Sequence, residues 1–327
     1  MKGDSGVKHD MFIIKGRGVN KKAVALMMVV LFLAGIGALG VRYFKQPDRA
    51  ADQGLKLQVI TSFYPLYYFA KEIGGDKAVV INITPAGAEP HDYEPTAEDI
   101  ARVEKSKILI LNGGGLEAWA DKIRNNIDPR HTIVVIAGEG LATRQVTEEG
   151  KTVSDPHVWL SPFLAKQMVD RIAQGFIHAD PDAEDYYRTN ADILKAKLDG
   201  LDTAYRLGLS HCKTQSIVTS HAAFGYLAAT YKLKQVSITG LAPDIEPSPR
   251  QLIDIVKFAR ENQVKYIFFE SLVSPKLSQT IANEVGAQTL VLNPIEGLTN
   301  AEMAQGKNYL TEMQSNLTNL KRALQCN

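Results

Sequence analysis

The stretch "SIVTSHAAFGYLAAT", residues 216–230, joins a short β-branched run to an apolar helical pattern, with one histidine, His221, at the junction. Short apolar runs that alternate with helical patterns are typical of α/β proteins, in which parallel strands are covered by helices on both faces. The stretch therefore predicts a strand, a turn and a helix in that order, and it places His221 directly after the strand.

The same alternation recurs on both sides of this stretch. The other strand-like runs are "LQVITSFY" (57–64), "AVVINIT" (78–84), "KILILNG" (107–113), "TIVVIA" (132–137), "KQVSITG" (234–240), "YIFFE" (266–270) and "QTLVLNP" (288–294). Helical patterns lie between them at 65–74, 97–105, 116–126, 222–231, 249–262 and 275–285. Four strands in each half predict two similar α/β lobes, each with a four-stranded, mainly parallel sheet.

One long helical pattern lies between the two halves. Its apolar positions recur at spacings of three and four: Tyr187, Ala191, Leu194, Leu198, Leu201 and Tyr205. Asp180 followed by Pro181 is a typical helix start. A helix from there to about Leu209 would be about 40 Å long, so we expect it to join the lobes rigidly.

The N-terminal 55 residues differ from the rest. Residues 23–41 carry no charge and are long enough to cross a bilayer as a helix. Lysine and arginine are more frequent before this run than after it, which predicts a cytoplasmic segment at 1–22 and a folded part outside the cytoplasm. We predict a membrane anchor at 23–41 and a polar tether at 42–55, with a cleaved signal sequence as the alternative.

The remaining chain divides into an N-terminal lobe at 56–160, a linking region with the long helix at 161–210, and a C-terminal lobe at 211–327. Its two cysteines, Cys212 and Cys326, would lie where disulfides form. We expect them to be bridged, with two free thiols as the alternative. The net charge of +1 and the well-mixed polar residues give no basic surface for nucleic acid.

Three of the seven histidines, His91, His157 and His221, follow predicted strands or lie on the loops that leave them. Ligands of open α/β sheets bind outside the carboxyl ends of the strands. If the two lobes face each other, the three imidazoles meet in one cleft. The other four histidines are assigned structural or solvent-exposed roles: His9, His131, His178 and His211.

Three converging imidazoles indicate a bound cation, and zinc accepts imidazole nitrogen and carboxylate oxygen in tetrahedral geometry. We therefore expect a carboxylate as the fourth ligand. Glu296 in "LNPIEGLT" follows the last strand and is the preferred candidate. Glu270, at the end of "YIFFE", is the second candidate and is expected instead to brace a ligand; Asp244 and Glu246 are weaker.

A resemblance to a known family rests on five segments in order: "EPHDYEPTAEDI", "DPHVWLSP", "TSHAAFGYLA", "IFFESLVSPKLSQTIANEVGA" and "LNPIEGLT". Together they resemble the zinc branch of the metal-specific solute-binding proteins of ABC transporters, from residue 57 to about 325. The resemblance implies two α/β lobes joined by a long helix, a metal in the cleft, and an ABC permease with its ATPase as partners. It also implies that His91, His157 and His221 are ligands. The histidine at the third position, His221, is similar to the zinc members, since manganese members usually carry a glutamate there.

The chain departs from the family pattern in two places. Many relatives place an aspartate ligand where this chain has Asn293, although some zinc members use the glutamate three residues later, here Glu296. Many zinc members also carry a histidine-rich loop before the second histidine, but residues 138–156 contain none.

We expect a monomeric zinc-binding protein, not an enzyme, that delivers Zn²⁺ to an ABC permease outside the cytoplasm. One alternative is a zinc-dependent hydrolase, which needs an open coordination position for water; the chain has no H-E-x-x-H or G-x-S-x-G motif. The other alternative is a metal-binding surface adhesin. Next to His91, we expect Asp92 and Glu94 to cap the following helix or to orient the imidazole.

Overall fold

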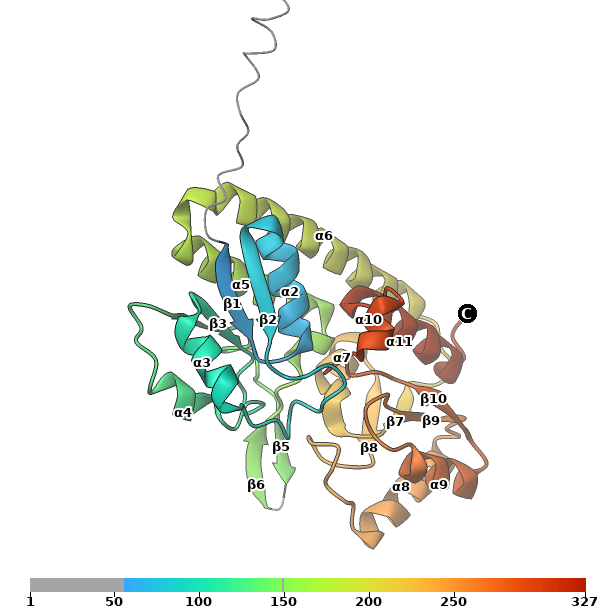
Figure 1. The fold of residues 1–327 in the computed structure, drawn as a ribbon. Helices are drawn as coiled ribbons and strands as arrows, with labels where there is room; N and C mark the ends of the chain where they lie inside the picture. Colours follow the sequence, from blue (N-terminus) through green and yellow to red (C-terminus); the bar gives the residue numbers. More distant parts are fainter. Residues whose placement is uncertain (1–55, 149) are drawn as a thin grey trace, which may run out of the picture. The chain divides into compact units, whose positions relative to one another are not determined.

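A computed structural model describes residues 56–148 and 150–327 (Figure 1). The predicted cytoplasmic segment at 1–22, the anchor at 23–41 and the tether at 42–55 lie outside the described residues. Within residues 56–148 and 150–327, no helix is long and apolar enough to cross a membrane.

Two four-stranded parallel sheets form the frame of the molecule, as the alternating pattern predicts. The first contains β1 (Leu57–Thr61), β2 (Ala78–Asn82), β3 (Ile108–Leu111) and β4 (Ile133–Ile136) in the order β2-β1-β3-β4. The second contains β7 (Ser216–Thr219), β8 (Lys234–Ser237), β9 (Tyr266–Phe269) and β10 (Gln288–Val291) in the order β10-β9-β7-β8. Written in reverse, β8-β7-β9-β10, the second sheet has the same strand order as the first, with the second strand of each half at one edge.

Helices cover both faces of each sheet, which explains why β3 and β9, inside their sheets, carry apolar residues on both faces rather than alternating with polar ones. Strand β3 illustrates this, because Ile108 and Ile110 pack on one face while Leu109 and Leu111 pack on the other. The helices of the first half are α2 (Tyr64–Gly74), α3 (Ala97–Lys105), α4 (Ala120–Arg124) and α5 (Pro162–Ala179). Those of the second half are α7 (Gly225–Tyr231), α8 (Pro249–Glu261), α9 (Lys276–Val285), α10 (Asn300–Ala304) and α11 (Tyr309–Leu324).

The long helix between the halves is α6 (Glu184–Gly208), about 38 Å in length. All six residues of its predicted apolar stripe are buried. It packs against α2 and α5 of the first half and against α11 of the second, and it runs along both in Figure 1. A 3₁₀ turn, Pro181–Ala183, precedes it, so the α-helix begins later than Asp180 and Pro181 predict.

A single hydrophobic cluster runs through both halves and α6. Two buried hydrogen bonds cross it: the Trp159 indole Nε1 donates to the Pro294 carbonyl over 2.8 Å, and the Tyr309 hydroxyl donates to the Trp159 carbonyl over 2.5 Å. Because a close-packed interior resists shear, the shared core supports the expectation that the halves move little relative to each other.

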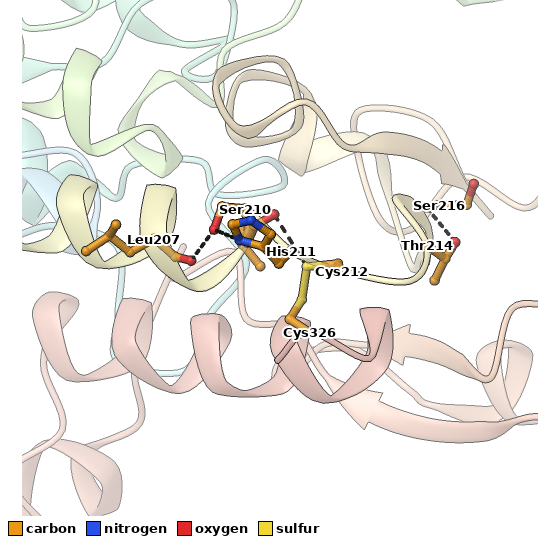
Figure 2. Close-up of a disulfide and its surroundings, with 8 residues drawn as sticks. Leu207, Ser210, His211, Cys212, Thr214, Ser216 and Cys326 are labelled. Carbon is orange, nitrogen blue, oxygen red and sulfur yellow. Dashed lines mark hydrogen bonds between the residues drawn. A yellow bond between two sulfur atoms is a disulfide. The ribbon is translucent and has the colours of Figure 1, made fainter.

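A disulfide joins Cys212, just after α6, to Cys326, just after α11 (Figure 2). The backbone on both sides is paired as well: Lys213 N donates to the Leu324 carbonyl, and Asn327 N donates to the His211 carbonyl, each over 3.1 Å. The bridge closes a loop of 114 residues. It therefore fixes the end of the chain to the start of the second half.

The structure contains some elements that the sequence patterns did not predict. Residues 138–156, to which no strand was assigned from the sequence, contain the antiparallel hairpin β5 (Gln145–Glu148) and β6 (Lys151–Ser154). Helix α4 is shorter than the pattern at 116–126 because the turn before it, through Gly115, extends to Trp119. Helices α5 and α11 were not assigned from the sequence, although both bury apolar faces.

Candidate metal centre

His91 lies on the loop between β2 and α3. The cap of α3 is Thr96, whose hydroxyl accepts from Asp99 N over 3.2 Å while the Asp99 carboxylate accepts from Thr96 N over 2.9 Å. Asp92 and Glu94 are exposed and do not form this cap. The expectation that they cap the helix is therefore wrong, because Thr96 and Asp99 already form a capping box.

His157 lies between β6 and the 3₁₀ turn η2 (Val158–Leu160). One oxygen of Asp155 accepts from both His157 N, over 3.0 Å, and His157 Nδ1, over 2.9 Å. The side-chain amide of Asn112, directly after β3, donates to the Pro156 carbonyl over 2.9 Å. The ring is thus oriented by its own loop, and that loop is attached to the end of a central strand.

His221 lies between β7 and the 3₁₀ turn η4 (Ala222–Phe224). Glu270, directly after the neighbouring strand β9, accepts from His221 Nδ1 over 2.6 Å and from His221 N over 3.1 Å. Strands β7 and β9 flank the point where the strand order of the sheet reverses, which is the usual place for ligands in such sheets. Glu270 therefore braces His221, the role preferred for it on sequence grounds.

Glu296 lies on the loop after β10. The preceding residue, Ile295, has φ +61°, a left-handed conformation that is unfavourable for a β-branched residue. Asn293 holds this turn, because its side-chain oxygen accepts from Ile295 N over 2.8 Å while its amide donates to Glu312 over 3.0 Å. Asn293 thus shapes the turn that presents Glu296.

The structure brings His91, His157, His221 and Glu296 together, with one ligand atom of each within 4.8 Å of the others. The His157 Nε2 atom lies 3.3 Å from the Nε2 atoms of both His91 and His221. The Glu296 Oε1 atom lies 3.4, 3.2 and 3.3 Å from the Nε2 atoms of His91, His157 and His221 in turn. Five of the six separations among these four atoms are therefore 3.2–3.4 Å. A regular tetrahedron with edges of this length would have its centre about 2.0 Å from each corner, which is a typical Zn–N or Zn–O bond length.

Hydrogen bonding directs lone pairs toward that centre. Because Nδ1 of His157 and Nδ1 of His221 each donate to a carboxylate, the Nε2 atom of each neutral ring carries its lone pair. Both oxygens of Glu296 are buried and have no hydrogen-bond partner among the described residues. Converging lone pairs and an unpartnered buried carboxylate fit a cation.

The electrostatics agree with this geometry. Burial favours a lower pKa for His157 and His221, but the hydrogen bonds to Asp155 and Glu270 and the negative charges of Asp155, Glu270 and Glu296 outweigh it and raise both pKa values, that of His221 well above its usual value. Burial favours a higher pKa for Glu296, but the three imidazoles hold its pKa well below the usual range. Without a metal, the cluster therefore retains protons that a cation would displace.

Sequence reasoning missed two carboxylates beside the cluster, Asp155 and Glu89. Glu89 Oε1 accepts from His91 N over 3.3 Å, and its Oε2 atom is buried without a partner in the described part of the chain. Burial, together with the charge of Glu296, raises the pKa of Glu89 to about 9. A signal was present in the sequence, since "EPH" and "DPH" place an acidic residue two positions before His91 and before His157.

Comparison with known proteins gives a consistent result. The family described as "Zinc-uptake complex component A periplasmic" matches residues 59–323. The high-affinity zinc uptake system protein ZnuA of Bacillus subtilis is 40% identical over 286 residues, which cover 84% of this chain and 90% of that protein. The zinc-binding lipoprotein AdcA of Streptococcus pneumoniae is 39% identical over 278 residues, 82% of this chain but 56% of that longer protein.

A solved structure shares the fold as well. The Zn(II)-bound ZnuA-like domain of Streptococcus pneumoniae AdcA is 39% identical, with a TM-score of 0.71, and the match covers 82% of this chain and 99% of that domain. The family match spans both sheets, the long helix and all four residues of the cluster. The chain therefore belongs to the family of the periplasmic component A of zinc-uptake complexes.

Proposed function

We propose that this protein captures Zn²⁺ at the cluster of His91, His157, His221 and Glu296, and that Zn²⁺ is its cargo. The observation that carries this proposal is the compact cluster of three imidazole nitrogens and one carboxylate oxygen, in which five of the six separations are 3.2–3.4 Å. Its size and its donor atoms suit zinc, whereas manganese favours more oxygen ligands in octahedral geometry.

The same geometry favours binding over catalysis. A catalytic zinc keeps one coordination position open for water or substrate. Here the Glu296 carboxylate supplies the fourth corner, and it is almost fully buried. The relatives compared above are uptake and binding proteins rather than enzymes. The protein is therefore assigned as a binding protein and not as a hydrolase.

Delivery to an ABC permease and its ATPase follows from family membership, because the related proteins belong to zinc-uptake systems. The protein would act outside the cytoplasm, attached to the membrane by residues 23–41 and spaced from it by residues 42–55. Support comes from the uncharged 19-residue run and from the excess of lysine and arginine at 1–22. We expect it to act as a monomer.

We also propose a division of the folded part into lobes at 56–160 and 211–327, with a linking region at 161–210. The repeated strand order of the two sheets and the position of α6 between them support these limits. The ligands then divide evenly: His91 and His157 come from the first lobe, and His221 and Glu296 come from the second.

The test is a calorimetric titration of the purified chain with Zn²⁺ and with Mn²⁺, repeated with Glu296→Gln. The amide keeps the shape of the side chain but removes its charge, so we expect one tight zinc per wild-type chain, weak manganese and clearly weaker zinc in the variant. A wild-type chain without stoichiometric zinc would refute the proposed function. Tight zinc binding that Glu296→Gln leaves unchanged would remove Glu296 from the ligand set.

A further inference from the structure

The β5–β6 hairpin extends from the first half of the molecule and contacts the second half at both its tip and its base. At the tip, Glu148 Oε1 accepts from Leu241 N over 2.5 Å, a contact between residues 93 positions apart. Strands β5 and β6 pair from Gln145 with Ser154 to Glu148 with Lys151, so the tip is held in register with the base. Zinc capture by His91, His157, His221 and Glu296 makes no direct use of this hairpin.

The residue that Glu148 contacts adjoins the loop of a proposed zinc ligand. The carbonyl of Gly240, next to Leu241, accepts from Ala222 N over 2.8 Å, and Thr239 N donates to the Ser220 carbonyl over 2.9 Å. Ala222 and Ser220 are the two chain neighbours of His221. The hairpin tip therefore braces the segment that carries His221.

The base of the hairpin contacts the other buried imidazole. The Arg144 guanidinium lies 3.4 Å from the Asp155 carboxylate, and Asp155 accepts from His157 Nδ1. Tyr226 in α7 links this base to the second half, because its hydroxyl accepts from Arg144 N over 2.9 Å and donates to the Asp155 carbonyl over 3.1 Å. One hairpin thus adjoins the supports of both His157 and His221.

Two glycines of the second half make room for these contacts. A Cβ atom at Gly240 would overlap the Glu148 carboxylate. A Cβ atom at Gly225 would lie 2.6 Å from Arg144 Nε and 2.7 Å from Asp155 Oδ2. Neither glycine has a positive φ, so backbone conformation does not require glycine there. A side chain at either position would instead force Glu148, Arg144 or Asp155 to move.

We infer that the β5–β6 hairpin is a clasp between the two halves and that Glu148 is a positioning residue that slows the release of Zn²⁺. This inference rests on the proposed function. While the Glu148–Leu241 hydrogen bond holds, the His221 segment stays against the rest of the cluster; when it breaks, the two halves lose a contact beside the site. Glu148 does not touch the ion, so its loss should act on release more than on capture.

The test is the rate of zinc release from the full chain into excess chelator, measured by stopped flow, together with the rate of zinc association. We expect Glu148→Ala to release zinc about tenfold faster with an unchanged association rate, since a hydrogen bond to a charged group is worth about that factor. Gly240→Ala should give the same increase by displacing the carboxylate, and the double variant should add little. Thr147→Ala, on the exposed side of the same strand, should match wild type.

The outcomes separate the two proposals. Wild type that binds no zinc overturns both the proposed function and the clasp. Wild type that binds zinc, with release from Glu148→Ala and Gly240→Ala no faster than release from wild type, overturns the clasp alone. If Glu148→Ala does not fold, the release rate of Gly240→Ala decides the question. Faster release matched by equally faster association would also overturn the clasp, because it would indicate general loosening.

Discussion

His157 and His221 are held differently from His91, although all three reach the same point. The rings of His157 and His221 are fully buried, and each donates through Nδ1 to a buried carboxylate. His91 is 10% exposed, and the carboxylate beside it, Glu89, accepts from its backbone rather than from its ring. The cluster thus consists of two rigid imidazoles, one buried glutamate and one less constrained imidazole at its surface.

The same local sequence produces both arrangements. Asp155 and Glu89 each lie two positions before a histidine, with a proline between, and each accepts from the backbone N–H of that histidine. Only Asp155 also reaches the ring. The difference teaches that an acidic residue at this spacing fixes the loop in both cases, whereas orientation of the imidazole needs an additional contact. His91 is therefore the ligand best able to move as zinc enters or leaves.

Removal of a ligand side chain should show the largest difference between the buried imidazoles, His157 and His221, and the partly exposed His91. We expect His221→Ala to weaken zinc binding by more than about a hundredfold, because it leaves Glu270 and Glu296 buried without their imidazole. This loss exceeds the roughly 10- to 100-fold that is usual when a residue that hydrogen-bonds to a metal ligand is removed. His91→Ala should cost less, since water can take the open position as in three-ligand zinc sites. Calorimetry with a competing chelator measures both, and equal losses would contradict the comparison.

The next effect concerns the carboxylates that orient the buried rings. Glu270→Gln and Asp155→Asn should each weaken zinc binding by about 10- to 100-fold, because the amide supports the imidazole less well than the carboxylate does. Glu89→Gln is the matched variant beside His91, and we expect a change below about threefold since Glu89 does not contact the ring. Similar losses for Glu89→Gln and Asp155→Asn would remove the distinction between the two kinds of support.

A third effect is the opposite response of the metal-free and zinc-loaded proteins to pH. The raised pKa values of His157 and His221 stabilise the metal-free fold fully below about pH 6.5, and this contribution is lost as pH rises through the folded-state values. For Glu89, whose pKa is raised to about 9, the fold loses stability over a wider range that begins at the usual carboxyl value of about 4.5. Zinc must displace those protons, so its affinity should rise over the same range. In thermal unfolding experiments, the Tm of the metal-free chain should fall from about pH 6 to 8.5, while the increase in Tm on adding zinc should grow. A Tm of the metal-free chain and a zinc-induced increase that change in the same direction with pH would contradict this prediction.

The smallest effect should come from the acidic residues on the other side of His91. Asp92 and Glu94 are exposed, and Thr96 rather than either of them caps α3. The double change Asp92→Ala with Glu94→Ala should therefore leave zinc affinity within about twofold, the scale of a surface substitution. A larger loss in the same titration would restore a role for these side chains at His91.

Much of this arrangement can be predicted from the sequence, because strands, helices and strand ends follow from local patterns. The apolar runs predict all eight strands of the two parallel sheets, and the stripe from Tyr187 to Tyr205 predicts the buried face of α6. The positions of His91, His157 and His221 after strands were enough to expect that they meet. The structure places them together with Glu296.

The sequence predicts contacts between distant segments less well. The hairpin at 145–154 has little apolar character. It is fixed by Glu148, which reaches across to Leu241 N, and by Tyr226 of the second half, which accepts from Arg144 N, and no local pattern encodes these contacts. The bracing of His157 by Asp155 was visible only as a spacing. The turn that presents Glu296 depends on Asn293 and on an isoleucine in a left-handed conformation, which side-chain preferences disfavour.

The central claim is that one zinc ion lies at the centre of the four side chains, and a crystal structure of the zinc-loaded chain with anomalous-scattering data at the zinc edge tests it most directly. The account predicts a single strong peak about 2.0 Å from the Nε2 atoms of His91, His157 and His221 and from Oε1 of Glu296, as in four-coordinate zinc sites. A peak outside this cluster, or one that lacks His157, His221 or Glu296 as a ligand, would contradict it.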